Sequence, residues 1–68
     1  MNWNKDSIFK FRLRLQIQSQ QELATLIGAS LSAVASWEQG AHVPDKRFRI
    51  ALDNLCKLNN ITNKDLGG

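Results

Sequence analysis

Glycine and proline occur at few positions, and these positions divide the chain into short segments. The 68 residues include four glycines and one proline, namely Gly28, Gly40, Pro44, Gly67 and Gly68. Both residue types interrupt regular structure, glycine through its backbone freedom and proline through its fixed φ and missing N–H group. Between these positions apolar residues recur three and four apart, which is typical of amphipathic helices. The sequence therefore predicts several short helices joined by tight turns.

The first predicted helix has a well-marked start. Asn4 is suited to cap a helix over residues 5–16, because its short side chain can accept hydrogen bonds from amides of the first turn. Trp3 and Ile8 have the spacing of a hydrophobic staple around this start. From Ile8 onward apolar residues recur on one side, so we expect that side to face a core.

The next two predicted helices are separated by a short turn. Ser19 and Glu22 have the spacing of a capping box, in which the serine caps the helix and the glutamate reaches back to the serine amide. Gly28 is expected to end this second helix. Ser30 is suited to cap a third helix that extends to about Gly40.

The last third of the sequence predicts one longer helix and a short capped segment. Asp45 is suited to cap a fourth helix that reaches about Leu58. Thr62 and Asp65 have the spacing of a second capping box, which predicts a short fifth helix or a single turn. We therefore expect an all-α fold of four to five helices in a single domain over residues 1–68.

Composition excludes several classes of site. Cys56 is the single cysteine and His42 the single histidine, so no disulfide can form within the chain and the usual ligands of a structural zinc are too few. Nothing in the spacing indicates a histidine base for a catalytic thiol. We therefore expect no enzymatic activity, no metal and no cofactor.

The sequence also lacks the features of membrane-inserted and secreted chains. No apolar run approaches the roughly 20 residues of a membrane span. The first residues do not form the charged start of a signal peptide. We therefore expect a cytoplasmic protein with no membrane partner.

Positive charge is concentrated in two clusters. The formal net charge is +3, and residues 15–45 contain no lysine or arginine. The first cluster consists of Lys10, Arg12 and Arg14, and the second of Lys46, Arg47 and Arg49. Two such clusters around a nearly uncharged centre fit a polyanionic partner. The alternative is that both are solvated helix faces.

The segment over residues 20–39 carries the most informative pattern. Ala24 is small where two helices would approach each other, and Gly28 can adopt the positive φ of a tight turn. Val34 follows as a branched apolar residue that can pack back under the preceding helix. This order of residue types predicts two short helices that cross closely over a three-residue turn.

This pattern resembles the phage-repressor type of helix-turn-helix, the Cro/CI and XRE-like regulators. The matching residues are Ser19-Gln20, Leu23-Ala24, Gly28-Ala29-Ser30, Val34, Trp37-Glu38, Gly40 and Pro44. The resemblance covers nearly the whole chain and is greatest for short Cro-type proteins. It implies a λ-repressor-like domain that binds double-stranded DNA sequence-specifically and regulates transcription, with its third helix in the major groove of an operator.

The resemblance implies a role for the outward face of the third helix. The residues expected to contact bases are Ser30, Leu31, Ser32, Ala35, Ser36 and Gln39. Small hydroxyls can hydrogen-bond base edges, and Leu31 can touch a thymine methyl group. The family often carries arginine or lysine here, and this chain does not, so we expect weaker direct readout supplemented by DNA shape. The alternative is that these serines only solvate an exposed helix.

Phosphate contacts are expected around this helix. The residues concerned are Gln20, Lys10, Arg12, Arg14, His42, Lys46, Arg47 and Arg49. In the resembled family the glutamine that matches Gln20 clamps a phosphate and braces the third helix. The family also implies an arginine–glutamate pair with Glu38, and the sequence leaves open whether Arg12 or Arg14 forms it.

The resemblance further implies a homodimer on a palindromic operator, because a single module of this size buries little surface on DNA. The residues expected at the dimer contact are Leu58, Ile61 and Leu66. The chain is expected to be a stand-alone repressor, and the alternative is a domain of a longer repressor. A different class of function is an antitoxin or anti-repressor that acts through protein–protein contact. An apolar outward face on the third helix would favour that alternative.

Overall fold

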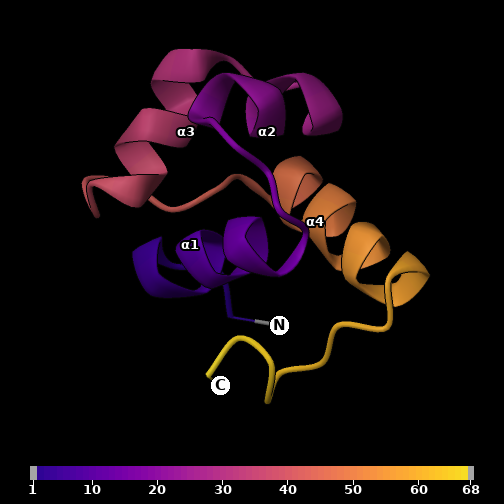
Figure 1. Cartoon of the computed structure of the whole chain (residues 1–68). Helices are drawn as coiled ribbons and strands as arrows, with labels where there is room; N and C mark the ends of the chain where they lie inside the picture. The colour runs from indigo at the N-terminus through magenta and orange to yellow at the C-terminus, as the bar shows by residue number, and fades with distance from the viewer. Residues whose placement is uncertain (1, 68) are drawn as a thin grey trace.

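The computed structural model describes residues 2–67, which form four α-helices and, within this range, no strand. The helices are α1 (Lys5–Arg14), α2 (Gln20–Ile27), α3 (Leu31–Glu38) and α4 (Lys46–Leu58) (Figure 1). The predicted all-α class is therefore confirmed, with four helices. The first helix ends two residues earlier than expected, because Gln16 has a φ of +57° and the chain turns away there.

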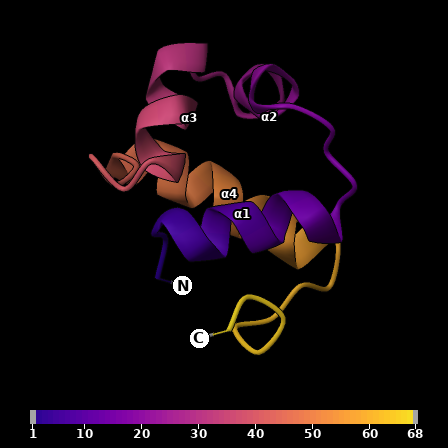
Figure 2. The same ribbon diagram turned by 60° about the vertical axis from the view of Figure 1, so that its left-hand side comes forward.

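The helices surround one small core. α3 packs against both α1 and α2, and α2 also contacts α4. Both views place α2 and α3 on one side of α1 and the C-terminal segment on its other side (Figures 1 and 2). Each helix contributes side chains that are fully buried, among them Phe11, Leu23, Val34 and Leu52. The core is therefore built from residues of all four helices.

The start of α1 is capped as predicted and more completely than predicted. The Asn4 side chain accepts hydrogen bonds from the amides of Asp6 and Ser7, each at 3.0 Å. The Ser7 hydroxyl in turn accepts from the Asn4 amide at 2.8 Å, which completes a reciprocal capping box. Trp3 and Ile8 are both buried, as a hydrophobic staple requires.

The capping box predicted for α2 forms only in part. Ser19 accepts from the Glu22 amide at 3.1 Å, as expected. The Glu22 carboxylate, however, accepts from the Gln18 amide at 3.1 Å rather than from Ser19. Ser19 has an extended backbone, with φ −145° and ψ 162°, so the amides of consecutive residues here point to opposite sides of the chain. The amide of Gln18 is therefore the one that faces the first turn.

In the C-terminal third one expectation is wrong, and the structure decides between the alternatives of another. Asp45 precedes α4 but forms no capping hydrogen bond; it lines a hollow beside His42 instead. Asp65 does accept from the Thr62 amide at 2.8 Å, yet the residues that follow Thr62 form hydrogen-bonded turns and no fifth helix. Their backbone hydrogen bonds join residues three apart, and Gly67, which has a φ of +77°, ends this series of turns. The single-turn alternative is therefore the correct one.

Candidate nucleic-acid interface

The turn between α2 and α3 has the close packing that its sequence predicts. Gly28 adopts a φ of +75°, in the left-handed region that glycine enters without steric cost. The Ala29 amide donates to the Ala24 carbonyl at 2.9 Å, which closes the end of α2. Ala24 and Val34 are both fully buried. The turn thus holds α3 firmly against α2.

The outward side of α3 is short and largely polar. Ser30, Leu31, Ser32 and Gln39 are exposed, and Ala35 and Ser36 are half-buried. Ser30 also caps the helix by accepting from the Ala33 amide at 3.1 Å. The six residues expected to contact bases therefore all keep some accessible surface at or beside α3.

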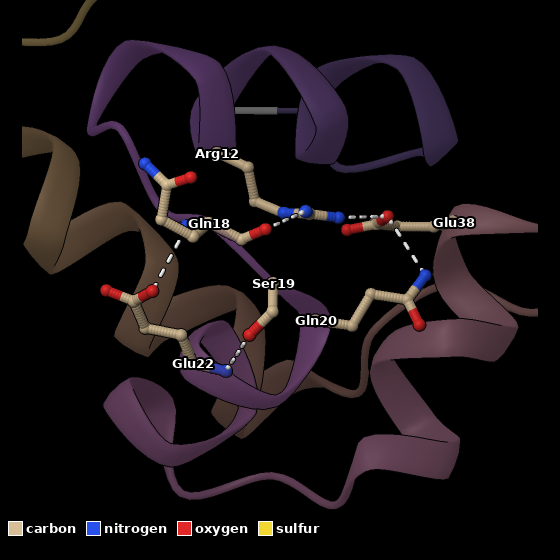
Figure 3. Close-up of polar contacts among 6 residues, drawn as sticks. All are labelled: Arg12, Gln18, Ser19, Gln20, Glu22 and Glu38. Carbon is tan, nitrogen blue, oxygen red and sulfur yellow. Dashed lines mark hydrogen bonds and ion pairs between the residues drawn. The ribbon is translucent and has the colours of Figure 1, made fainter.

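A polar network ties α3 to the two preceding helices (Figure 3). Arg12 Nη1 donates to Glu38 Oε1 at 2.6 Å, and Gln20 Nε2 donates to the same oxygen at 3.1 Å. Arg12 Nη2 also approaches the Gln18 carbonyl oxygen at 3.5 Å. Arg12 is therefore the partner of Glu38. The bracing contact expected of Gln20 is also present.

This network is largely shielded from solvent. The side chains of Arg12 and Glu38 are 16% and 11% exposed. Arg12 Nε and Glu38 Oε2 are buried and, among the described residues, have no hydrogen-bond partner. A charge in such surroundings is costly unless its counter-charge is present. Arg12 thus serves the fold, and little of its charge is accessible for a phosphate.

Two further cations of α1, Lys10 and Arg14, point toward the C-terminal turn, whereas Lys5 lies beside Gly40 after α3. Arg14 Nη2 lies 3.5 Å from Asp65 Oδ1. The Lys10 ammonium group lies directly beside Gly67 of this turn. The turn packs on the side of α1 away from α2 and α3 (Figures 1 and 2). The cluster on α1 therefore does not form one surface with α3.

The cations of α4 are arranged differently. Lys46, Arg47 and Arg49 are all exposed and form no ion pair within residues 2–67. They lie in or beside the first turn of α4, which contains no acidic residue. The guanidinium carbon of Arg47 lies 4.5 Å from the centre of the Phe48 ring, which orients this side chain. These charges are available to a partner.

His42 lies in the loop between α3 and α4 and contacts α3 directly. Its Nδ1 atom is 2.5 Å from the Ser36 hydroxyl. The sequence did not predict this pair, because the residues are six apart across the end of a helix. His42 and Ser36 line a hollow of about 270 Å³ together with Trp37, Asp45 and Phe48.

Two of the three residues expected at a dimer contact are used inside the chain. Ile61 and Leu66 are only 6% and 4% exposed and belong to the core. Leu66 lies beside Ser7 and Lys10 of α1, whereas Ile61 follows α4 closely and its amide donates to the Cys56 carbonyl at 2.8 Å. Leu58, in contrast, is 79% exposed. The expectation for Ile61 and Leu66 is therefore corrected, and Leu58 remains available.

The chemistry of the remaining groups is structural. Burial, with a smaller contribution from the charge of Asp53, raises the pKa of the Cys56 thiol to about 11, so this thiol is protonated at neutral pH. The Thr62 amide, which donates to the Asp65 carboxylate, lowers the pKa of Asp65, and Arg14 acts in the same direction. Within residues 2–67, no three potential metal ligands come together. The four helices are also too short or too polar to cross a lipid bilayer.

Comparisons with known proteins assign no family to the chain. No protein-family model matches the sequence, and neither a curated protein nor a solved structure is significantly similar to it. The interface is therefore judged on the residues of this chain: the polar side of α3, the network that positions it and the cations of α4.

Proposed function

We propose that this chain is a λ-repressor-like helix-turn-helix domain that binds double-stranded DNA sequence-specifically and regulates transcription. The observation that carries the proposal is the exposed outward side of α3 with its two cap residues, which is mostly polar, together with unpaired cations at the start of α4. A helix fits the major groove of B-DNA, where each base pair presents its own pattern of donors and acceptors. α3 would read these base edges.

The side chains of α3 suit a modest direct readout. Ser30, Ser32 and Gln39 are exposed and can donate to or accept from base edges, and the exposed Leu31 can contact a thymine methyl group. Without an arginine on this face, no bidentate guanine contact is available from α3. DNA shape would therefore contribute to the choice of sequence.

The cations of α4 suit phosphate binding. Positive charge at a helix N-terminus opposes the helix dipole, at a cost of about 0.3–1 kcal/mol per group. Lys46 and Arg49 both carry this cost without an ion pair among the described residues. An anionic partner at this end of α4 would offset it, as phosphates do when they position a protein on DNA.

Gln20 supports α3 in this arrangement. Its amide already donates to Glu38, so the side chain is fixed between α2 and α3. The N-terminus of α2, where Gln20 lies, is suited to approach a phosphate, because its amides point outward along the helix axis. The domain would bind as a homodimer on a palindromic operator, with Leu58 as the exposed apolar residue of the expected contact.

A protein partner is the competing hypothesis. Phe9 and Leu13, four apart on α1, are 52% and 62% exposed and form a small apolar surface outside α3. An antitoxin or anti-repressor could use such a surface. The polar character of α3 itself favours DNA.

The proposal is tested by selection from a random-sequence pool of duplexes about 30 base pairs long, followed by binding at several salt concentrations. We expect enrichment of a two-fold symmetric site and an affinity that falls steeply with salt. Ser32→Glu should abolish binding by placing negative charge on α3. Asn54→Glu adds the same charge to an exposed position of α4 and should bind normally. No enrichment, or equal loss in both variants, would overturn the proposal.

A further inference from the structure

The contact between Ser36 and His42 joins the proposed DNA-binding helix to the loop that follows it. Ser36 is half-buried on α3 and His42 is exposed, with Oγ and Nδ1 2.5 Å apart. Both residues were expected to contact DNA independently. At this distance the hydroxyl and the ring share one hydrogen bond, so the hydrogen-bonding role of each depends on the other.

The direction of this bond depends on the charge of the imidazole. In a neutral ring one nitrogen donates and the other accepts, whereas both nitrogens of a charged ring donate. When Nδ1 carries no proton, the Ser36 hydroxyl must donate to it. When Nδ1 takes a proton from solvent, the hydroxyl must rotate and accept, and its own hydrogen is then directed elsewhere. The heavy atoms can keep the same positions in both states.

Few charged groups surround the ring. Apart from Asp45, the other residues that line the hollow around His42 are uncharged: Ala33, Ser36, Trp37, Val43 and Phe48. Arg47 of α4 lies on the ring of Phe48, and Lys5 of α1 lies beside Gly40, two residues before His42. Thus α3 presents no charge to the ring here, and the start of α4 presents one carboxylate and one guanidinium. Histidine changes its charge between pH 5 and 8, within the range of ordinary binding experiments.

We propose that Ser36 and His42 form a proton-controlled contact with DNA. This inference rests on the proposed function. At pH 8 Ser36 donates to Nδ1, so its hydroxyl positions the ring and offers no hydrogen to DNA. At pH 5.5 the charged ring donates to Ser36. The Ser36 hydrogen then becomes available to an acceptor on a base edge, and His42 presents a positive charge to a phosphate.

The first test measures affinity for the duplex enriched in the selection described above, at pH 5.5 and pH 8 and constant ionic strength. We expect the wild-type chain to bind about fivefold more tightly at pH 5.5, the gain from making one hydrogen bond charge-assisted. Since His42 is the single histidine, His42→Gln should remove this dependence. Ser36→Ala should reduce it without removing it, because the charge remains.

The outcomes separate the two proposals. Salt-sensitive binding that does not change with pH, or a pH dependence that His42→Gln retains, would overturn the proton-controlled contact and leave DNA binding intact. Absence of binding at both pH values would overturn the proposed function, and with it the contact.

A second measurement needs no DNA. The ¹⁵N chemical shifts of the single imidazole identify which nitrogen is protonated in the free chain. We expect Nδ1 to be unprotonated at pH 8 and the balance between the two neutral forms to change in Ser36→Ala. A protonated Nδ1 at pH 8, or shifts unaffected by Ser36→Ala, would overturn the proposal.

Discussion

The two basic clusters of this chain have the same number of cations and are used in opposite ways. On α1, Arg12 pairs with Glu38, and Arg14 approaches Asp65. On α4, Lys46 and Arg49 form no ion pair among the described residues. The sequence alone gave both clusters the same role, as phosphate contacts. The comparison shows that cations grouped in the sequence can be paired by the fold in one helix and left unpaired in another.

The position of each cluster in its helix supports this distinction. Arg12 and Arg14 lie in the last turn of α1, where positive charge is favoured by the helix dipole, and Asp6 lies in its first turn. Lys46 and Arg49 lie at the start of α4, where the dipole opposes them. Arg12 and Arg14 thus lie where the dipole stabilises them, whereas Lys46 and Arg49 lie where it destabilises them. The phosphate contacts of the proposed function would offset that cost.

The largest effect is expected from breaking the pair of Arg12 and Glu38. Arg12→Ala leaves the Glu38 carboxylate nearly buried without its counter-charge, and we expect the free energy of unfolding to fall by about 2–4 kcal/mol. Urea unfolding measures this. Arg14→Ala is the matched control, because its side chain is 56% exposed and solvent screens its pair with Asp65, so its loss should be clearly smaller. Equal losses in the two variants would contradict the distinction between the two arginines.

A smaller loss is expected at the other donor to Glu38. Gln20→Ala removes one hydrogen bond to a mostly buried carboxylate and should reduce stability by about 1–2 kcal/mol. Gln21→Ala is the matched control, since Gln21 donates only to Thr25 on the exposed side of α2. If the two variants unfold at the same urea concentration, Gln20 does not brace α3.

Removing cations of the α4 cluster should weaken DNA binding without reducing stability. The double variant Lys46→Ala/Arg49→Ala should lose two phosphate contacts. The slope of log affinity against log salt concentration should therefore fall in magnitude by about 2, and DNA binding should weaken roughly tenfold. The same variant should be as stable as the wild-type chain or slightly more stable. Lys10→Ala with Arg14→Ala removes the same charge from α1. If that control weakens binding equally, the two clusters do not differ in function.

The smallest effect concerns acid stability at the C-terminal turn. The pKa of Asp65 is lowered in the folded chain, chiefly by the Thr62 amide and also by Arg14. Asp65 therefore contributes fully to stability above the pKa that its carboxyl has in the unfolded chain, about 4. This contribution is lost as the pH falls from there through the lower pKa of the folded chain. Asp65→Asn should make stability less dependent on pH between 5 and 2, as measured by urea unfolding. An unchanged pH dependence would show that this turn contributes nothing through Asp65.

Local features were predictable because short-range chemistry determines them. Asn4, Ser19 and Ser30 cap helices where the sequence indicated, and Gly28 adopts the positive φ that the turn requires. The burial of Val34 and Trp37 follows from their spacing. In each case the decisive neighbours lie within a few residues. The sequence is therefore sufficient to predict the positions of the four helices and most of their ends.

Long-range pairings were not predictable in the same way. Arg12 and not Arg14 reaches Glu38, because the packing of α1 against α3 decides which of its faces meets that side chain. Ile61 was expected at a dimer contact, yet it is buried in the core of the chain itself. Both outcomes depend on distances between segments, which residue spacing does not contain.

The amino-acid sequence thus determined the helices, their caps and the tight turn before α3, because backbone hydrogen bonds and glycine conformations are local. The packed chain determined which charges are neutralised, which apolar residues are covered and which hydroxyl contacts His42. Those depend on burial, and burial is a property of the assembled core. The candidate interface is what remains exposed and unpaired after the core has formed.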